Sequence, residues 1–458
     1  MKAMNRIVLI SAVGLGAMIP AAHAWRWHGL YEALAWIAPL PFLLTRRDFV
    51  RRACQAVMLA GVLVTLDSMV HFIAARQALD APWHRLAMII SLASLLPALA
   101  AWALEHPLFS KSAPPRPAAS TGTARTIPAS PSPSAPWPAL AACALAFFGL
   151  AMVQLKVPTP MLLAERFLSG AGWLQAVLLA LYAGFVAEAL LTPGRSPVVR
   201  GRIWGFFSLV FFGQLALGLA GFERFLMTGK LHLPVPALIV AGPLFRGEGL
   251  FMLILYGVTV LLAGPAWCSH LCYIGAWDSA LARAKKRPGP LPAWARRGRM
   301  ILAGTVFAAA WIMGRLGVPA GWAVALAAGF GLTGVGVMIG ISRRSGVMAH
   351  CAGFCPMGLV SGVLGRLSPW RLRIREGCTA CGVCSRACRY DALRPSDLAA
   401  RRPGVSCSLC GDCLSSCPRS EMELTLFGRA RLAGVPARAV FVAMVAGLHA
   451  VFLGVARL

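Results

Sequence analysis

The feature that most constrains this chain is a succession of apolar runs, each close to the length that crosses a bilayer. A transmembrane helix needs roughly 20 mainly apolar residues. The sequence contains 58% hydrophobic and 13% charged residues, with a mean hydropathy of +0.70, whereas soluble proteins carry about 25% charged residues. About eleven runs meet this description, and they lie near residues 7–24, 29–44, 53–75, 86–104, 139–155, 170–191, 203–221, 249–266, 300–318, 321–341 and 433–456. The sequence therefore predicts an all-α polytopic transmembrane bundle.

Two of these runs leave alternatives open. The 29–44 run is short and interrupted by proline, so an interfacial or re-entrant segment is an alternative to a span. The 7–24 run follows the basic stretch Met1–Arg6 and ends at Ala22-His23-Ala24, which resembles a signal-peptidase site. We favour an uncleaved first helix, because the orientation below needs its N-terminus inside but needs no cleavage.

Lys and Arg residues define the orientation. With the N-terminus inside, the inner loops carry about three times as many of them as the outer loops, as the positive-inside rule expects. The same placement explains the net charge of +28, so nucleic-acid binding is not predicted. We expect a multi-pass protein of the bacterial inner membrane, with the 267–299 loop and residues 342–432 in the cytoplasm.

Composition along the chain predicts five parts. Residues 105–138 are rich in Pro, Ser and Ala and have no apolar period, so they form a linker rather than a core. The parts are an N-terminal membrane bundle (1–104), this cytoplasmic linker (105–138), a core membrane domain (139–341), a small α+β cytoplasmic ferredoxin-type domain (342–432) and a C-terminal transmembrane helix (433–458).

Two cysteine runs near the C-terminus carry the strongest chemical signal. Residues 378–388 read CTACGVCSRAC and residues 407–417 read CSLCGDCLSSC. Each is C-x2-C-x2-C-x3-C, the run of bacterial two-cluster ferredoxins, in which the fourth cysteine binds the other cluster. Zinc ribbons need no third and fourth cysteine at these offsets. The pattern predicts two [4Fe–4S] clusters: cluster I on Cys378, Cys381, Cys384 and Cys417, and cluster II on Cys407, Cys410, Cys413 and Cys388. The usual proline after the first run is replaced by Arg389.

Two further pairs of C-x3-C spacing follow apolar runs. They are Cys268 with Cys272, and Cys351 with Cys355. On a helix this spacing places both sulfurs on one face. A third metal centre, a thiol redox relay and plain packed cysteines are all consistent with them. His270 and His350 beside them are candidates for a further ligand or for a hydrogen-bond donor to the ligands, although an ordinary interfacial polar residue is the favoured interpretation for either alone. The remaining Cys54 and Cys143 lie inside apolar runs and are expected to be small buried hydrophobes.

Together these motifs resemble the NapH/NosR-type membrane polyferredoxins, which combine transmembrane spans, two C-x3-C-P motifs and a two-cluster ferredoxin module. The resemblance covers roughly residues 203–432, and it departs at the first pair, where Tyr273 stands in place of proline. It implies electron transfer between the quinone pool and a respiratory or maturation partner, as in a quinol dehydrogenase-type subunit.

Polar residues inside the apolar runs are candidates for a quinol, proton or haem site. Asp67 and His71 are four residues apart in one run and face the same way. His232 and His449 map to the outer half of the predicted topology, as does His71. A haem b on His71 and His449 is less favoured than ordinary hydrogen bonding between helices.

The sequence thus predicts a membrane-bound relay that moves electrons between quinol and a redox partner through two [4Fe–4S] clusters. Arg371, Arg373, Arg375, Arg386 and Arg389 crowd the first cysteine run, so we expect that partner to be acidic. The alternative function is a redox accessory factor for assembly or maturation of a membrane or periplasmic metalloenzyme.

Overall fold

The computed structural model describes residues 2–109, 136–192, 194–226, 233–428 and 433–455. The chain divides into two compact units. The first is built from the described parts of residues 1–126, 131–188 and 446–455, and the second from those of residues 189–445. Most of the predicted linker (110–135) and His232 lie outside the described residues.

Eight helices in the described part of the chain are long and apolar enough to cross a membrane, so the protein is a mostly helical, multi-pass chain. In seven of them most residues are not buried by the chain itself, as a lipid-facing surface requires, whereas 67% of Val435–Gly454 is buried. These spans are Asp48–Gln77, His84–Ala103, Trp137–Lys156, Ala171–Leu191, Ser196–Leu219, Phe251–Leu271, Ala320–Ser345 and Val435–Gly454.

Three of the eleven predicted runs are not among the eight spans. The 29–44 run forms the short helix α2 (Leu30–Ile37) and a 3-10 helix, η1 (Leu40–Thr45), because Pro39 and Pro41 interrupt the helical hydrogen bonds. The 7–24 run lies in α1 (Lys2–His28), and the 300–318 run overlaps α12 (Ala293–Arg315). The predicted count of eleven spans therefore stays a prediction.

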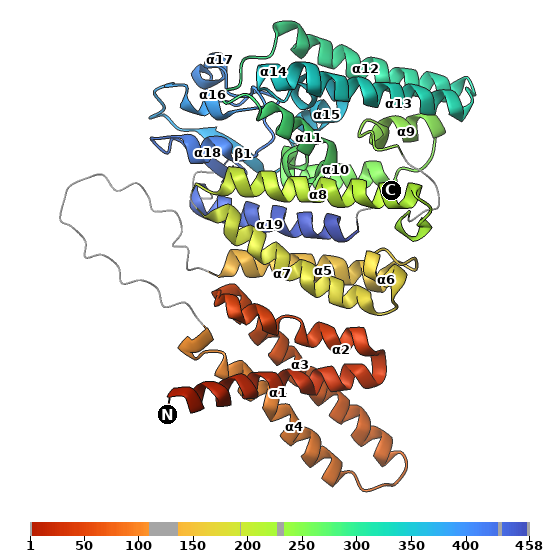
Figure 1. The fold of residues 1–458 in the computed structure, drawn as a ribbon, viewed down its shortest axis with the longest axis vertical. Coiled ribbons are helices and arrows are strands. Elements are labelled where there is room, and N and C mark those ends of the chain that lie inside the picture. Colours follow the sequence, from red (N-terminus) through yellow and green to blue (C-terminus); the bar gives the residue numbers. More distant parts are fainter. Residues whose placement is uncertain (1, 110–135, 193, 227–232, 429–432, 456–458) are drawn as a thin grey trace, which may run out of the picture. The chain divides into compact units, whose positions relative to one another are not determined.

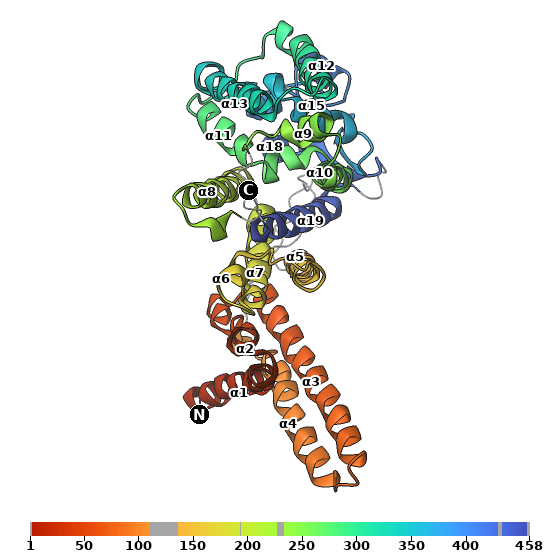
Figure 2. The same ribbon diagram turned by 90° about the vertical axis from the view of Figure 1, so that its right-hand side faces the viewer.

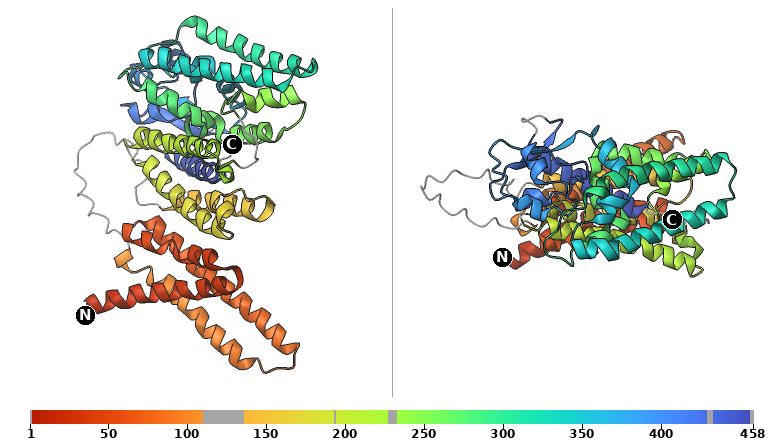
Figure 3. Two further views of the ribbon diagram at one scale, coloured as in Figure 1. Left: turned by 45° about the vertical axis from the view of Figure 1, so that its right-hand side comes forward. Right: turned by 90° about the horizontal axis from the view of Figure 1, so that it is seen from above.

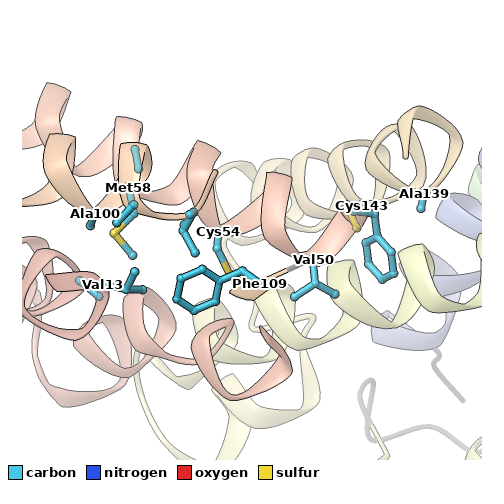
Figure 4. Packing of buried hydrophobic residues seen from close by; sticks show 13 residues of the cluster. Val13, Val50, Cys54, Met58, Ala100, Phe109, Ala139 and Cys143 are labelled. Carbon is cyan, nitrogen blue, oxygen red and sulfur yellow. The ribbon is translucent and has the colours of Figure 1, made fainter. Parts of the chain in front are cut away.

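The first unit is an all-helical assembly in which α1 packs against α2, α3 and α4 (Figure 1). Figure 2 shows α3 and α4 running side by side from the connection between them. Cys54 and Cys143 are both buried here among apolar side chains that include Val50 and Met58 (Figure 4). Besides α1, α2 and η1, its elements are α3 (Asp48–Gln77), α4 (His84–Ala103), η2 (Pro107–Phe109), α5 (Trp137–Lys156), α6 (Leu163–Phe167) and most of α7 (Ala171–Leu191).

The second unit holds all twelve motif cysteines, on the segments coloured green to blue in Figure 3. Its helices are interrupted by short π-helical turns, which are frequent at functional sites. In chain order it contains α8 (Ser196–Leu219), η3 (Glu223–Phe225), α9 (Leu238–Arg246), α10 (Phe251–Ala263), η4 (Gly264–Ala266), η5 (Trp267–Leu271), α11 (Tyr273–Ala282), α12, α13 (Ala320–Val337), η6 (Met338–Ser342), α14 (Arg343–Ser345), η7 (His350–Phe354) and α15 (Pro356–Leu364). Helix α19 (Val435–Gly454) is divided between the two units.

A small module follows α15 and carries the two long cysteine runs. Its elements are β1 (Trp370–Ile374), α16 (Val383–Ala387), α17 (Pro395–Ala399), α18 (Asp412–Ser416) and β2 (Met422–Leu426). Strands β1 and β2 pair antiparallel, with Trp370 opposite Leu426 and Ile374 opposite Met422. Alternate residues of β1 are buried, which is the period-2 pattern of a strand with one covered face. Trp370 fixes the module to the membrane helices, since its Nε1 donates to the carbonyl oxygen of Leu262 in α10 (2.8 Å).

Candidate iron–sulfur sites

The two long cysteine runs have the same backbone conformation. In each, a residue between the first two cysteines has a left-handed φ, namely Ala380 (φ 51°) and Leu409 (φ 53°). A left-handed glycine then begins a five-residue helix, Gly382 before α16 and Gly411 before α18. Each helix ends at the fourth cysteine, Cys388 or Cys417, whose backbone is extended. The turns therefore present the cysteines of both runs in the same order.

Four cysteines line one small cavity, the first candidate site. Three come from the first run, Cys378, Cys381 and Cys384, and the fourth is Cys417 from the end of the second run. Leu398 and Met422 provide apolar lining. Cys381 is exposed and Cys384 is buried, so one side of the site reaches the surface of the module.

A second small cavity is lined by Cys407, Cys410 and Cys413, together with Cys388 from the first run. Its other walls include Leu372, Tyr390 and Leu424. Burial raises the pKa of Cys388 and Cys413, and the charges of the other cysteines in the cavity raise both further. Bare thiols are therefore protonated at neutral pH, and binding of iron here releases protons.

The donor set of both cavities fits a [4Fe–4S] cluster. Each cavity offers four thiols and no histidine among its lining residues. One carboxylate lines each cavity, Glu421 in the first and Asp412 in the second, and these pair with Arg375 and Arg200. Four cysteines are the usual ligands of this cluster. The second cavity is also the more enclosed by apolar side chains.

A buried ion pair supports the second cavity. Arg200, at the start of α8, is 2% exposed and donates to Oδ2 of Asp412 (2.7 Å), the first residue of α18. The guanidinium also lies over the ring of Trp204, 5.5 Å from its centroid. Sequence reasoning missed this pair, although an arginine near the start of an apolar span and an acidic residue inside a cysteine run were both visible.

The conformation of Gly411 should matter for stability. Its φ of 82° is disfavoured for residues with a Cβ, although a methyl group there would meet only Leu414, at 3.8 Å. We expect Gly411→Ala to lower the free energy of unfolding by about 1–2 kcal/mol because of backbone strain alone. Gly201→Ala in α8 is the matched control: it meets nothing within 4 Å and has no left-handed φ, so it should be neutral or stabilising. Thermal unfolding in detergent measures both, and equal midpoints would contradict the assignment of strain to Gly411.

The two C-x3-C pairs are not placed on regular helices as the spacing predicted. Cys268 and Cys351 lie in the π-helical turns η5 and η7, but Cys272 and Cys355 have left the helix and are extended. Each of these second cysteines then precedes a new helix, α11 or α15. The expectation of both sulfurs on one helical face is therefore wrong, because each helix ends between its two cysteines.

The two pairs nevertheless repeat one another. Each is followed by a glycine, giving C-x3-C-x2-G at Gly275 and Gly358. A Cβ at Gly275 would lie 3.0 Å from the carbonyl oxygen of Cys268, and one at Gly358 would lie 2.6 Å from that of Cys351. The glycines thus let each new helix cross closely over the first cysteine of its own pair. The C-x3-C-x2-G spacing is visible in the sequence and could have predicted this close crossing.

The histidines beside the pairs have different environments. His270 is buried and its Nδ1 lies 2.9 Å from Oγ of Ser269. His350 is also buried, with its ring 5.5 Å from that of Phe354. Neither ring nitrogen of His350 has a hydrogen-bond partner within the described residues.

Of the polar residues predicted to form a membrane site, His232 lies outside the described residues, and the structure places Asp67 and His71 in other surroundings than His449. Asp67 and His71 contact each other on α3, with Oδ2 and Nδ1 3.5 Å apart, and both side chains are exposed. His449 in α19 is fully buried, and its Nε2 lies 3.1 Å from the hydroxyl of Tyr182 in α7. The two histidines therefore have different surroundings, and His449 makes the ordinary contact between helices that was the favoured interpretation.

Four of the five arginines near the first run have partners within the described residues, although Arg373 and Arg375 stay exposed. Arg371 donates to the backbone carbonyls of Gly365 and Ser368. Arg373 and Arg375 pair with Glu423 (3.7 Å) and Glu421 (4.0 Å). Arg389, which replaces the expected proline, donates to the carbonyls of Ala282 (2.7 Å) and Gly346 (2.8 Å) and so joins the module to the end of α11.

Comparison with known proteins points to the same chemistry. The family model Fer4_5, described as a 4Fe-4S binding domain, matches residues 246–290 and 327–375, which contain the two C-x3-C pairs. An Escherichia coli (strain K12) protein named "Putative electron transport protein YccM" is 37% identical over 71 residues. That stretch covers 15% of this chain and 19% of the relative. No solved structure matches the chain. These similarities fit a membrane-bound 4Fe–4S polyferredoxin type of protein and support iron–sulfur electron transfer.

Proposed function

We propose that this membrane iron–sulfur protein relays electrons between the quinone pool and a redox partner through two [4Fe–4S] clusters. Cluster I would be held by Cys378, Cys381, Cys384 and Cys417, and cluster II by Cys407, Cys410, Cys413 and Cys388. A bound cluster supplies a one-electron carrier whose potential depends on burial and on hydrogen bonds to its sulfurs.

One observation carries the proposal: the eight cysteines gather in two cavities of four, and each cavity takes its fourth cysteine from the other run. If the two cavities were accidental packing defects, there would be no reason for each to take its fourth cysteine from the other run. The two-cluster ferredoxin pattern requires it.

Quinol chemistry suits two carriers. Oxidation of one quinol to quinone releases two electrons and two protons, so two one-electron acceptors receive both electrons. The eight spans give a lipid-soluble quinol access to the chain, and α10 connects directly to the module through Trp370. These features support a quinol donor, with the module in the cytoplasm on the side that the positive-inside rule assigns.

The exposed margin of the first cavity is the favoured docking point for a partner. Cys381 is exposed there, and Arg386 and Arg419 beside it are exposed as well. These two arginines are placed to attract an acidic redox protein. Charge on this rim would mainly raise the association rate and make it sensitive to salt.

Reduction by quinol tests the function. The chain is purified anaerobically in detergent and mixed with a short-chain quinol, and cluster absorbance and EPR are followed. We expect the clusters to be reduced with quinone formed in a ratio of one quinone to two electrons. Dithionite serves as the control for clusters that are present but do not accept electrons from quinol. Reduction by dithionite alone would contradict the respiratory role and favour the accessory factor for metalloenzyme assembly.

A further inference from the structure

One side chain of a membrane helix reaches the wall of the second cavity, here named site II, the first cavity being site I. Arg200 of α8 is 2% exposed, and its Nη2 donates to Oδ2 of Asp412 (2.7 Å). Its Nη1 donates to the carbonyl oxygen of Ser269 in η5 (3.4 Å). Ser269 in turn donates from its hydroxyl to the carbonyl oxygen of Ser408, which lines site II (2.9 Å). The positive charge of Arg200 is therefore buried directly behind this wall.

Asp412 brings a negative charge to the same wall. It lines site II between Cys410 and Cys413, and its side chain is only 12% exposed. Its Oδ1 has no hydrogen-bond partner among the described residues. A carboxylate in this position opposes reduction of a cluster on the four thiolates, because reduction adds a further negative charge to the site. Like charges repel more strongly where water is excluded.

Site I has no charge at the matching position. In each run one residue stands between the left-handed glycine and the third cysteine, and it is Asp412 in the second run but Val383 in the first. The carboxylate that lines site I is Glu421, which pairs at 4.0 Å with Arg375, a side chain that is 53% exposed. Water screens an exposed pair of this kind. Of the two sites, as far as the structure describes them, site II is the one with a buried charge pair in its wall.

Further hydrogen bonds fix the distance between α8 and site II. Trp204, one turn after Arg200, donates from Nε1 to the carbonyl oxygen of Cys272 (2.6 Å). Tyr390 lines site II, and its hydroxyl donates to the carbonyl oxygen of Cys268 (3.3 Å). The segment that contains Cys268 and Cys272 is thus bonded to α8 on one side and to site II on the other, so the charge of Arg200 stays at a constant distance from the cavity.

We propose that Arg200 sets the reduction potential of a cluster at site II by offsetting the negative charge of Asp412. It is a positioning residue in this role, because it acts through Asp412 and is not among the residues that line the cavity. The inference rests on the proposed function, since it needs a cluster at site II. It goes beyond that function by assigning control of one carrier to a membrane helix and not to the ferredoxin-type module.

The two members of the pair should shift the potential of site II in opposite directions. Asp412→Asn removes the negative charge and keeps the shape of the side chain, so the reduced state is favoured and the potential rises. Arg200→Gln leaves the carboxylate without its cation, so the potential falls. For each variant we expect at least a tenfold change in the reduction equilibrium, which is about 59 mV for a one-electron step. A pair that only held the fold together would lower stability in both variants without opposite shifts.

Redox titration followed by EPR measures the potentials in the full-length chain, purified anaerobically in detergent and reduced with dithionite. The signal of site II is the one that Cys413→Ser removes. Arg200→Lys keeps the charge and should keep the potential of site II close to that of the wild-type chain. Arg202→Gln removes an exposed arginine from the same helix and is the matched control, so it should shift no potential. The potential of site I should be the same in every variant.

The shifts of site II decide the proposal. A potential that is unchanged or raised in Arg200→Gln would overturn it, as would one that is unchanged or lowered in Asp412→Asn. If Arg200→Gln does not retain iron at site II, the double variant Arg200→Gln, Asp412→Asn decides, because it leaves no stranded charge. Its potential should lie below that of Asp412→Asn and close to that of the wild-type chain, and equal potentials in Asp412→Asn and the double variant would overturn the role of Arg200.

Failure of this proposal can be distinguished from failure of the proposed function. Because dithionite takes the place of quinol in the titration, clusters that quinol cannot reduce still give their potentials. Clusters that are present but do not shift as expected would overturn the role of Arg200 and leave the electron relay intact. A chain without clusters would overturn both.

Discussion

Serine substitution of Cys388 and of Cys413 is expected to remove the same cluster, although the two residues belong to different runs. Both line the second cavity, and a cubane that loses one of its four thiolates is bound poorly or not at all. Each variant should lose about four irons per chain and the same EPR signal. Cys417→Ser should instead remove the signal of the first site, although it lies only four residues after Cys413.

The comparison between these variants does not require either EPR signal to be assigned to a particular site beforehand. Cys143→Ala is the control for loss of a buried cysteine outside both cavities, and its iron content should equal that of the wild-type chain. If Cys413→Ser and Cys417→Ser were to remove the same signal, each run would hold its own cluster and the exchange of fourth ligands would be wrong.

Breaking the pair between Arg200 and Asp412 is expected to be the most destabilising single change outside the cysteines. Arg200→Met leaves the carboxylate of Asp412 buried without its cation, which costs about 3–5 kcal/mol of unfolding free energy when a buried pair loses one partner. Chemical unfolding of the detergent-solubilised protein measures the loss. Because Asp412 lies between Cys410 and Cys413, iron at site II should be lost at lower denaturant concentration than iron at site I.

Two matched variants test the reason for this loss. Arg373→Met removes an arginine that is 44% exposed and pairs with Glu423 at 3.7 Å, so it should cost no more than about 1 kcal/mol. The double variant Arg200→Met, Asp412→Leu should recover much of the stability, since an apolar pair can replace a buried ion pair at little cost. A double variant as unstable as Arg200→Met would show that packing around the arginine, and not the stranded charge, is responsible.

Local chemistry was the most predictable part of this protein. The spacing of the two long runs predicted which four cysteines line each cavity, including the exchange of Cys388 and Cys417. This was possible because the geometry of cluster ligation restricts the spacing of the cysteines in the sequence. The eight spans followed from length and hydropathy for the same kind of reason: a bilayer accepts few alternatives to an apolar helix.

Features that depend on tertiary packing were not predictable. Spacing alone placed Cys268 and Cys272 on one helical face, but the helix ends between them, and nothing in a single motif reveals where the backbone leaves the helix. Arg200 and Arg299 stand at the ends of apolar runs, where the sequence indicates only loop charges on the inner side, but both are buried. Their burial follows from helices that are distant in sequence. The sequence also did not reveal that Arg371 and Arg389, two of the five arginines near the first run, are bound to backbone carbonyls.

The exchanged fourth cysteines have a consequence for biogenesis. The cavity lined by Cys378, Cys381 and Cys384 lacks its fourth cysteine until the ribosome has synthesised Cys417. The cavity of the second run likewise needs Cys388 as its fourth cysteine. Neither site can therefore be completed while the other half of the module is still missing. If the two sites hold clusters as proposed, iron at either site gains its full set of four thiolates only after the second cysteine run has left the ribosome.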